Sequence, residues 1–156
     1  MQRVLSISVE SGSSIAVWAA YFANAHIKGV DIQSQTWRFD LFDLNSLRIQ
    51  LLELDATLPS ASREIVRKGS PRLYDIILED ASHLPDHQVQ HLAVFAASLA
   101  PCSIYIVEDI HEHYAHRVRH ELAQISTLHS LRMELYDLRN SKGRFDNILA
   151  VCYRER

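Results

Sequence analysis

The chain has 156 residues, of which 47% are hydrophobic and 22% are charged, an ordinary composition for a globular domain with its own core. Its formal net charge of −3 gives no electrostatic footprint for nucleic acid or an anionic membrane. No apolar run reaches the ~20 residues of a membrane span, and the N-terminus lacks a signal-peptide layout. We therefore expect residues 1–156 to form one cytoplasmic domain that binds neither nucleic acid nor membrane.

The two cysteines show no metal-binding spacing. Cys102 and Cys152 are expected to be small core residues in a reducing compartment. The nine histidines are a high count. Four of them fall within polar or amphipathic helical patterns and are expected on the surface: His87, His91, His116 and His120.

Apolar runs alternate with helical patterns along the chain. In chain order the predicted elements are a strand at Arg3–Val9, a helix at Ser13–Phe22, strands at His26–Ile32 and Ile49–Asp55, a helix at Pro59–Lys68, a strand at Tyr74–Asp80, a helix at Pro85–Leu99, a strand at Ser103–Asp109, a helix at His116–Leu128, and strands at Leu131–Leu138 and Asn147–Tyr153. Ser11, Ser13 and Ser14 are the N-cap candidates of the first helix. Pro101 ends the third helix.

Strands that alternate with helices predict a parallel sheet wound on both faces. The last two strands are joined by a hairpin-type connection at residues 140–144 with no room for a crossover helix, so they must be antiparallel. We therefore expect an α/β, Rossmann-like, doubly wound sheet of seven strands. Its predicted order is 3-2-1-4-5-7-6 with the last strand antiparallel, a layout similar to that of class I methyltransferases that use S-adenosylmethionine.

Two acidic segments follow buried strands. Glu79–His83 comes directly after the apolar run Tyr74–Leu78, and Glu108–His111 comes after Ile104–Val107. Residues just past the carboxyl ends of parallel strands line the ligand crevice of an open α/β sheet. Hard divalent cations prefer carboxylate oxygens, so a metal site is predicted at this edge.

A second set of signals lies at the first three strand ends. The loop after the first strand contains Gly12, which permits close approach of the backbone to a cofactor. Asp31 ends the second strand, where a carboxylate can accept hydrogen bonds from ribose hydroxyls. Asp55 ends the third strand, a position suited to the adenine side. Together these positions predict a nucleotide-type cofactor.

Three segments resemble a known family. They are Ser11–Ile15 with Trp18, Tyr21, Phe22 and Ile27–Ile32; Asp75–His83; and Tyr105–His111 with Tyr114. They are similar to the corresponding segments of the macrocin/mycinamicin-type sugar O-methyltransferases, metal-dependent enzymes of natural-product pathways. The resemblance runs from about Val4 to Tyr114.

The resemblance implies which metal and cofactor bind, which residues hold them and which reaction takes place. The residues implied for Mg²⁺ are Asp80, Glu108 and Asp109. Those implied for S-adenosylmethionine are Ser8, Gly12, Asp31 and Asp55. His83 is implied as the general base, since Mg²⁺ lowers the pKa of an acceptor hydroxyl and a histidine can then take its proton. The expected activity is O-methylation of a small, hydroxylated natural product, sugar-like or polyketide-type.

The sequence also departs from the family. Ser6 and Ser8 stand where the family carries an acidic residue and a glycine. Ala81 replaces a glycine, and Cys102 and Ser103 replace a glycine pair. The chain also starts at the first strand, so we expect it to lack the usual N-terminal lid. A second subunit or a partner chain could then complete the active site.

Two classes of function therefore remain. Intact Asp31, Asp55 and His83 favour a working methyltransferase. Ser6 and Ser8 favour a degenerate methyltransferase-like domain that serves another metal- and histidine-dependent reaction or a binding role. A nicotinamide oxidoreductase is less favoured than either, because G-x-G-x-x-G is absent.

Overall fold

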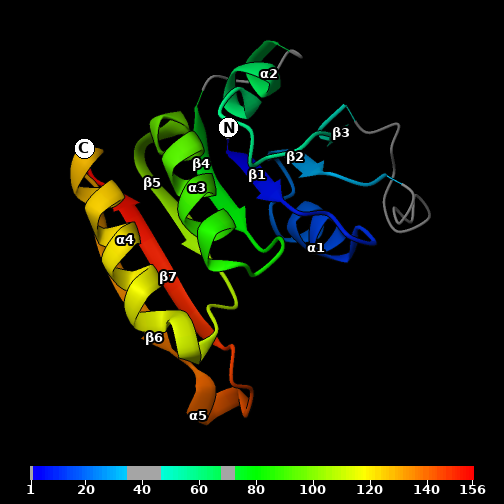
Figure 1. Cartoon of the computed structure of the whole chain (residues 1–156). Coiled ribbons are helices and arrows are strands. Elements are labelled where there is room, and N and C mark those ends of the chain that lie inside the picture. The colour runs from blue at the N-terminus through cyan, green and yellow to red at the C-terminus, as the bar shows by residue number, and fades with distance from the viewer. Residues whose placement is uncertain (1, 35–46, 68–72) are drawn as a thin grey trace.

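The computed structural model describes residues 2–34, 47–67 and 73–156. Within these ranges one seven-stranded sheet has the order β3-β2-β1-β4-β5-β7-β6 (Figure 1). The strands are β1 (Arg3–Ile7), β2 (His26–Asp31), β3 (Ile49–Glu53), β4 (Tyr74–Glu79), β5 (Leu99–Val107), β6 (Arg132–Asp137) and β7 (Ile148–Arg154). The helices are α1 (Ser13–Tyr21), α2 (Ala61–Arg67), α3 (Pro85–Phe95), α4 (Ala115–Leu128) and α5 (Arg139–Lys142), with 3₁₀ turns η2 (Ala96–Ser98) and η3 (Glu112–Tyr114).

The pairing of the strands confirms the predicted topology. The pairs β1–β2, β1–β4, β2–β3 and β4–β5 are parallel. Strand β7 is antiparallel to both β5 and β6. The expectation of a helix-free connection before β7 is wrong in one detail, because the four-residue helix α5 lies there. A single helical turn is too short to carry a crossover, so the strands stay antiparallel.

Two apolar clusters cover the two faces of the sheet. Alternate residues of β1 point to opposite faces, and Val4 and Leu5 accordingly belong to different clusters. The smaller cluster packs against α1 through Ile15. The larger one contains buried residues of α2, α3 and α4, such as Leu92 and Leu122. In Figure 1, α3 and α4 lie along the strands β4 to β7. The doubly wound arrangement expected from the sequence is therefore present.

Several predicted boundaries shift, most of all around Pro101. Helix α3 ends at Phe95, and β5 begins at Leu99. The pairing of β5 with β4 is irregular between Tyr74 and Ile76, and Cys102 in this stretch has a positive φ of 57°. Proline is tolerated at such a bulge, so Pro101 lies inside the strand and does not end the helix.

The cysteine prediction holds for one residue only. Cys152 is buried, and burial raises the pKa of its thiol. Cys102, expected in the core, is exposed because it lies in the bulge of β5.

The second predicted helix begins at Ala61, two residues after Pro59, and Lys68 lies outside the described residues. Across the described ranges, no helix combines the length and apolar character that a membrane span requires.

Candidate functional site

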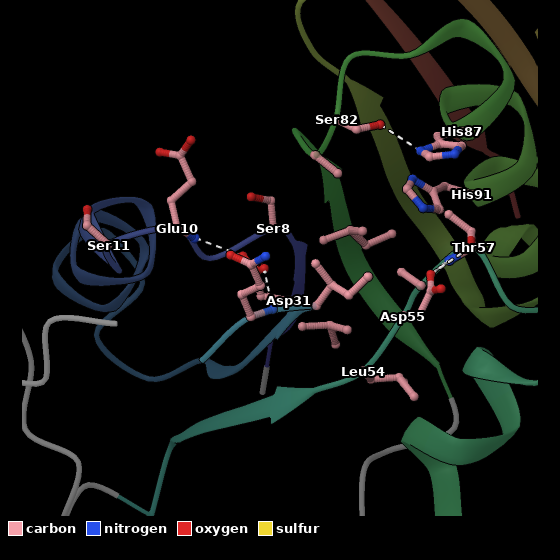
Figure 2. Close-up of a pocket in the computed structure, with 16 residues that line it drawn as sticks. Ser8, Glu10, Ser11, Asp31, Leu54, Asp55, Thr57, Ser82, His87 and His91 are labelled. Carbon is pink, nitrogen blue, oxygen red and sulfur yellow. Dashed lines mark hydrogen bonds between the residues drawn. The ribbon is translucent and has the colours of Figure 1, made fainter. Parts of the chain in front are cut away.

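A pocket of about 800 Å³ opens at the carboxyl ends of β1, β2 and β3. It is lined by Ser8 after β1, Asp31 at the end of β2, Asp55 after β3, and His91 of α3. Figure 2 shows Ser8 and Asp31 on one side of it and His91 on the other. The predicted edge of the sheet therefore carries a real cavity, large enough for a nucleotide-sized ligand.

Asp31 fixes the loop that follows β1. Its Oδ2 accepts hydrogen bonds from the backbone N–H groups of Val9 at 2.7 Å and Glu10 at 2.9 Å. Its Oδ1 accepts a bond from the Gln33 N–H at 3.1 Å. A carboxylate has about four acceptor positions, so Asp31 can hold the loop and still receive a ligand hydroxyl.

The loop itself has an uncommon backbone. Ser8 and Glu10 have φ of 87° and 46°, in the left-handed region that favours glycine. Gly12, with φ 94°, is the N-cap residue of α1 and lies beside the pocket without being one of its lining residues. The predicted serine N-cap is wrong, because no side chain caps α1; Ser11 and Ser13 bond each other through their hydroxyls at 2.9 Å.

Asp55 is held in its ionised form at the other side of the pocket. Its Oδ1 accepts bonds from the hydroxyl of Thr57 at 2.6 Å and from the backbone N–H of Thr57 at 2.9 Å. The side-chain bond, followed by the backbone bond, lowers the pKa of Asp55. His87 and His91 act on Asp55 in the same direction, which places both imidazoles within electrostatic reach of it.

A second polar group lies where β4 and β5 end. Candidate ligand atoms of Asp80, His83 and Asp109 lie within 4.8 Å of one another, and all three residues are half-buried. His83 Nε2 and Asp80 Oδ1 are hydrogen-bonded at 3.0 Å. His83 and Asp109 have φ of 55° and 50°, and such strained residues cluster at functional sites. Two carboxylates and an imidazole could hold a divalent cation.

The electrostatics of this group couple its members. The hydrogen bond that Asp80 accepts from His83 has the largest effect on the pKa of His83 and raises it, whereas burial opposes this effect. Burial raises the pKa of Asp109, whereas His83 lowers it. Arg144 Nη2 lies 3.6 Å from Asp109 Oδ2 and also pairs with Asp146 at 2.8 Å. The negative charge of these carboxylates is therefore only partly compensated by Arg144.

The predicted metal residues are not all together. Asp80 and Asp109 converge, with His83 beside them, but Glu108 is not part of this group. The backbone of Glu108 is fixed by two bonds: its N–H donates to the Glu79 carbonyl at 2.9 Å, and its carbonyl accepts from Gln88 Nε2 at 3.0 Å. Of the predicted cofactor residues, Ser8, Asp31 and Asp55 line the pocket.

Sequence reasoning missed a buried pair beside the pocket. His91, expected on the surface, is 2% exposed, and its Nδ1 lies 3.0 Å from Oε1 of Glu79, which is 0% exposed. His91 follows Gln88 by three residues and precedes Phe95 by four, and both are buried. This helical spacing was the signal that His91 belongs to the inner face.

No family model matches the chain. The mycinamicin VI 2''-O-methyltransferase of Micromonospora griseorubida is 27% identical over 115 residues, which are 69% of this chain and 27% of that protein. An 8-demethyl-8-alpha-L-rhamnosyl tetracenomycin-C 2'-O-methyltransferase of Streptomyces olivaceus is 27% identical over 103 residues, 66% of this chain and 25% of that protein.

Solved structures decide the fold. MycE methyltransferase, from the mycinamycin biosynthetic pathway and in complex with Mg, SAH and mycinamycin VI, matches with a TM-score of 0.73 at 20% identity. The match covers 100% of this chain and 45% of that one. This chain has the class I methyltransferase fold. The resemblance of its sequence to sugar O-methyltransferases is confirmed, although the methyltransferase-like chain spans only about a quarter of the two curated relatives' length.

Proposed function

We propose that residues 1–156 form the catalytic domain of an O-methyltransferase that uses S-adenosylmethionine and Mg²⁺. The observation that carries the proposal is the continuity of the two sites. Ala81 and Ser82 line the pocket, while their neighbours Asp80 and His83 belong to the acidic group. The methyl group of a donor bound in the pocket would therefore lie beside the residues proposed to bind and deprotonate an acceptor hydroxyl.

On the acceptor side, the converging carboxylates of Asp80 and Asp109 are proposed to hold Mg²⁺, with Glu108, which lies outside their group in the structure, as a third ligand. The donor set fits, because Mg²⁺ prefers carboxylate oxygens and keeps other positions for water and substrate. When bound, the ion would supply positive charge that lowers the pKa of the acceptor hydroxyl. His83 then holds the proton that this hydroxyl releases as its oxygen attacks the methyl carbon.

On the donor side, Ser8, Gly12, Asp31 and Asp55 are proposed to surround S-adenosylmethionine. The remaining acceptor position of Asp31, on Oδ1, suits a ribose hydroxyl. The cofactor would supply an activated methyl group. The remaining task of the chain is alignment of oxygen, methyl carbon and sulfur, for which a rigid loop tied to Asp31 is suited.

The curated relatives support a small natural-product acceptor, sugar-like or polyketide-type, since their names specify such substrates. A second copy or a partner chain that completes the active site is part of the same proposal. A cytoplasmic location belongs to the same proposal.

One observation favours the alternative, a domain that has lost methyl transfer. Ser8 adopts a backbone conformation that suits glycine, and its side chain lies on the wall of the cofactor pocket. If this side chain blocks the ligand, the protein would keep its acidic group for another metal-dependent or binding role.

Calorimetric titration with S-adenosylmethionine and with its demethylated product, with and without Mg²⁺, tests the proposal. Wild-type protein should bind both ligands. Asp31→Ala should bind S-adenosylmethionine more weakly than wild type. His83→Ala should bind it like wild type, but its turnover, measured separately as methyl transfer, should be lower by roughly 10²–10⁴-fold. His116→Ala, a change of an exposed histidine on α4, should match wild type in both measurements. Absence of ligand binding by wild-type protein at millimolar concentration would support the alternative.

A further inference from the structure

The Glu79–His91 pair leaves two buried polar atoms without partners. His91 Nε2 and Glu79 Oε2 make no hydrogen bond to any residue that the structure describes. Native proteins rarely leave such atoms unpaired, and each case requires an explanation. Because His91 lines the cofactor pocket, the missing partner of its Nε2 can be a ligand.

Glu79 determines which hydrogen-bonding role this nitrogen plays. If the Glu79 carboxylate is the acceptor of the 3.0 Å bond, His91 Nδ1 carries the proton. In the neutral ring Nε2 is then a hydrogen-bond acceptor. An acceptor whose tautomer is fixed by Glu79 therefore lies at the wall of the pocket, itself buried in this structure, and a ligand that reaches it must offer an N–H or O–H donor.

The position of His91 indicates which part of a nucleotide it faces. Figure 2 shows Asp31, the residue suited to ribose, across the pocket from His91. The pocket is also lined by the apolar residues Leu54, Ala56 and Ala81, which can pack against a flat base. Since the methyl group must face the acidic group, the base extends toward Asp55 and His91. Adenine there offers one exocyclic donor, its 6-amino group.

We propose that His91, oriented by Glu79, accepts a hydrogen bond from the 6-amino group of the cofactor's adenine and so selects adenine over a 6-oxo purine. This inference rests on the proposed function. His87, also on α3, is less suited, because it is only half-buried and water can satisfy its free Nε2, whereas Nε2 of His91 is buried. Asp55 is the competing acceptor on this wall: its Oδ1 takes both bonds from Thr57, and its Oδ2 can also accept, but Asp55 is only half-buried and water can satisfy that oxygen.

The test compares the affinities of S-adenosylhomocysteine and S-inosyl-homocysteine by calorimetry. The second ligand carries a 6-oxo group in place of the amino group. Wild-type protein should prefer the adenine ligand by at least about tenfold, because a built hydrogen-bonding site rejects a mismatched group. In His91→Leu the two affinities should differ by less than about threefold. His116→Leu, a change of an exposed histidine on α4 that does not line the pocket, should keep the wild-type preference.

Glu79→Gln gives a readout that a merely structural role would not produce. A glutamine amide can donate or accept, so it releases the tautomer of His91 and lets Nε2 carry a proton. The 6-oxo ligand should then bind more tightly than it does to wild type, while the adenine ligand binds more weakly. This variant also carries the test if His91→Leu does not fold.

The other outcomes overturn the inference. An unchanged preference in both His91→Leu and Glu79→Gln would exclude His91 as the selective residue. Loss of the preference in Asp55→Asn, with His91→Leu like wild type, would assign the role to Asp55. Failure of wild-type protein to bind either ligand would overturn the proposed function as well, whereas normal binding with unchanged selectivity overturns this inference alone.

Discussion

Asp80 and His83 are joined by a hydrogen bond of 3.0 Å between Oδ1 and Nε2, within the loop that leads from β4 to α3. This bond is the largest cause of the raised pKa of His83 relative to its ordinary value of 6.5. Coulombic attraction to Asp80, Asp109 and Glu79 adds to it, and burial opposes it. The histidine proposed as a base is therefore held by a residue proposed as a metal ligand.

The first prediction concerns the pKa of His83, measured by NMR titration of its imidazole. It should lie above 6.5 in metal-free protein and fall on addition of Mg²⁺, because the cation takes Asp80 and repels the imidazolium. Asp80→Asn should lower it without metal. Turnover should fall as the pH drops through this pKa, since the protonated ring cannot accept a proton. A value unaffected by Mg²⁺ would exclude a metal at Asp80.

The same raised pKa predicts a dependence of stability on pH. A folded-state pKa above the unfolded value means that the Asp80–His83 bond stabilises the protein fully below the unfolded pKa of His83. That stabilisation should be lost as the pH rises through the folded-state pKa. Thermal unfolding of wild type and His83→Ala across this range should converge at high pH. A constant difference would show that protonation of His83 does not contribute.

The second prediction concerns Asp109→Asn. Mn²⁺ binding, followed by electron paramagnetic resonance, should weaken by at least about tenfold, because a carboxylate ligand is lost. Without metal the variant should be as stable as wild type or more stable, since burial and neighbouring acids raise the pKa of Asp109 and make its ionised form costly. Asp86→Asn, a change of an exposed acid paired with Arg117, should bind Mn²⁺ like wild type.

The sequence could predict which edge of the sheet carries the acidic residues, but not which of these residues come together there. Apolar runs that end in Asp80 and Asp109 place both acids past parallel strands, because periodicity and alternation determine the topology. The separation of Glu108 from this group depends on the backbone turn at Asp109, whose φ of 50° no pattern of residue types encodes. Likewise, contact between Glu79 and His91 depends on how α3 packs on β4, a tertiary feature.

The third prediction concerns Ser8→Gly. A residue with a side chain destabilises the folded state by about 1–2 kcal/mol when its backbone is left-handed. Glycine removes this strain, but it also increases the conformational entropy of the unfolded chain, which offsets part of the stabilisation. At the Ser8 φ of 87° the variant should raise the free energy of unfolding by about 0.5–1 kcal/mol, measured in urea. S-Adenosylhomocysteine should bind at least as tightly as to wild type. Ser6→Gly, a change within the buried part of β1, should instead destabilise the protein.

The last prediction separates the two roles of Asp31. In Asp31→Ala the N–H groups of Val9 and Glu10 lose their acceptor, so the free energy of unfolding should fall by about 1–3 kcal/mol. Affinity for S-adenosylhomocysteine should fall at least about tenfold, since hydrogen bonds to a charged acceptor are the strong ones. Asp31→Asn keeps one carbonyl oxygen, which can still accept from the loop, so it should lose affinity with a smaller loss of stability. Asp75→Ala is the matched control, because Asp75 accepts from the Arg3 N–H at 2.7 Å at the start of β1, away from the pocket. That control should lose stability and keep its affinity for S-adenosylhomocysteine. If Asp75→Ala lost as much affinity as Asp31→Ala, binding would follow global stability, and Asp31 would have no direct part in holding the cofactor.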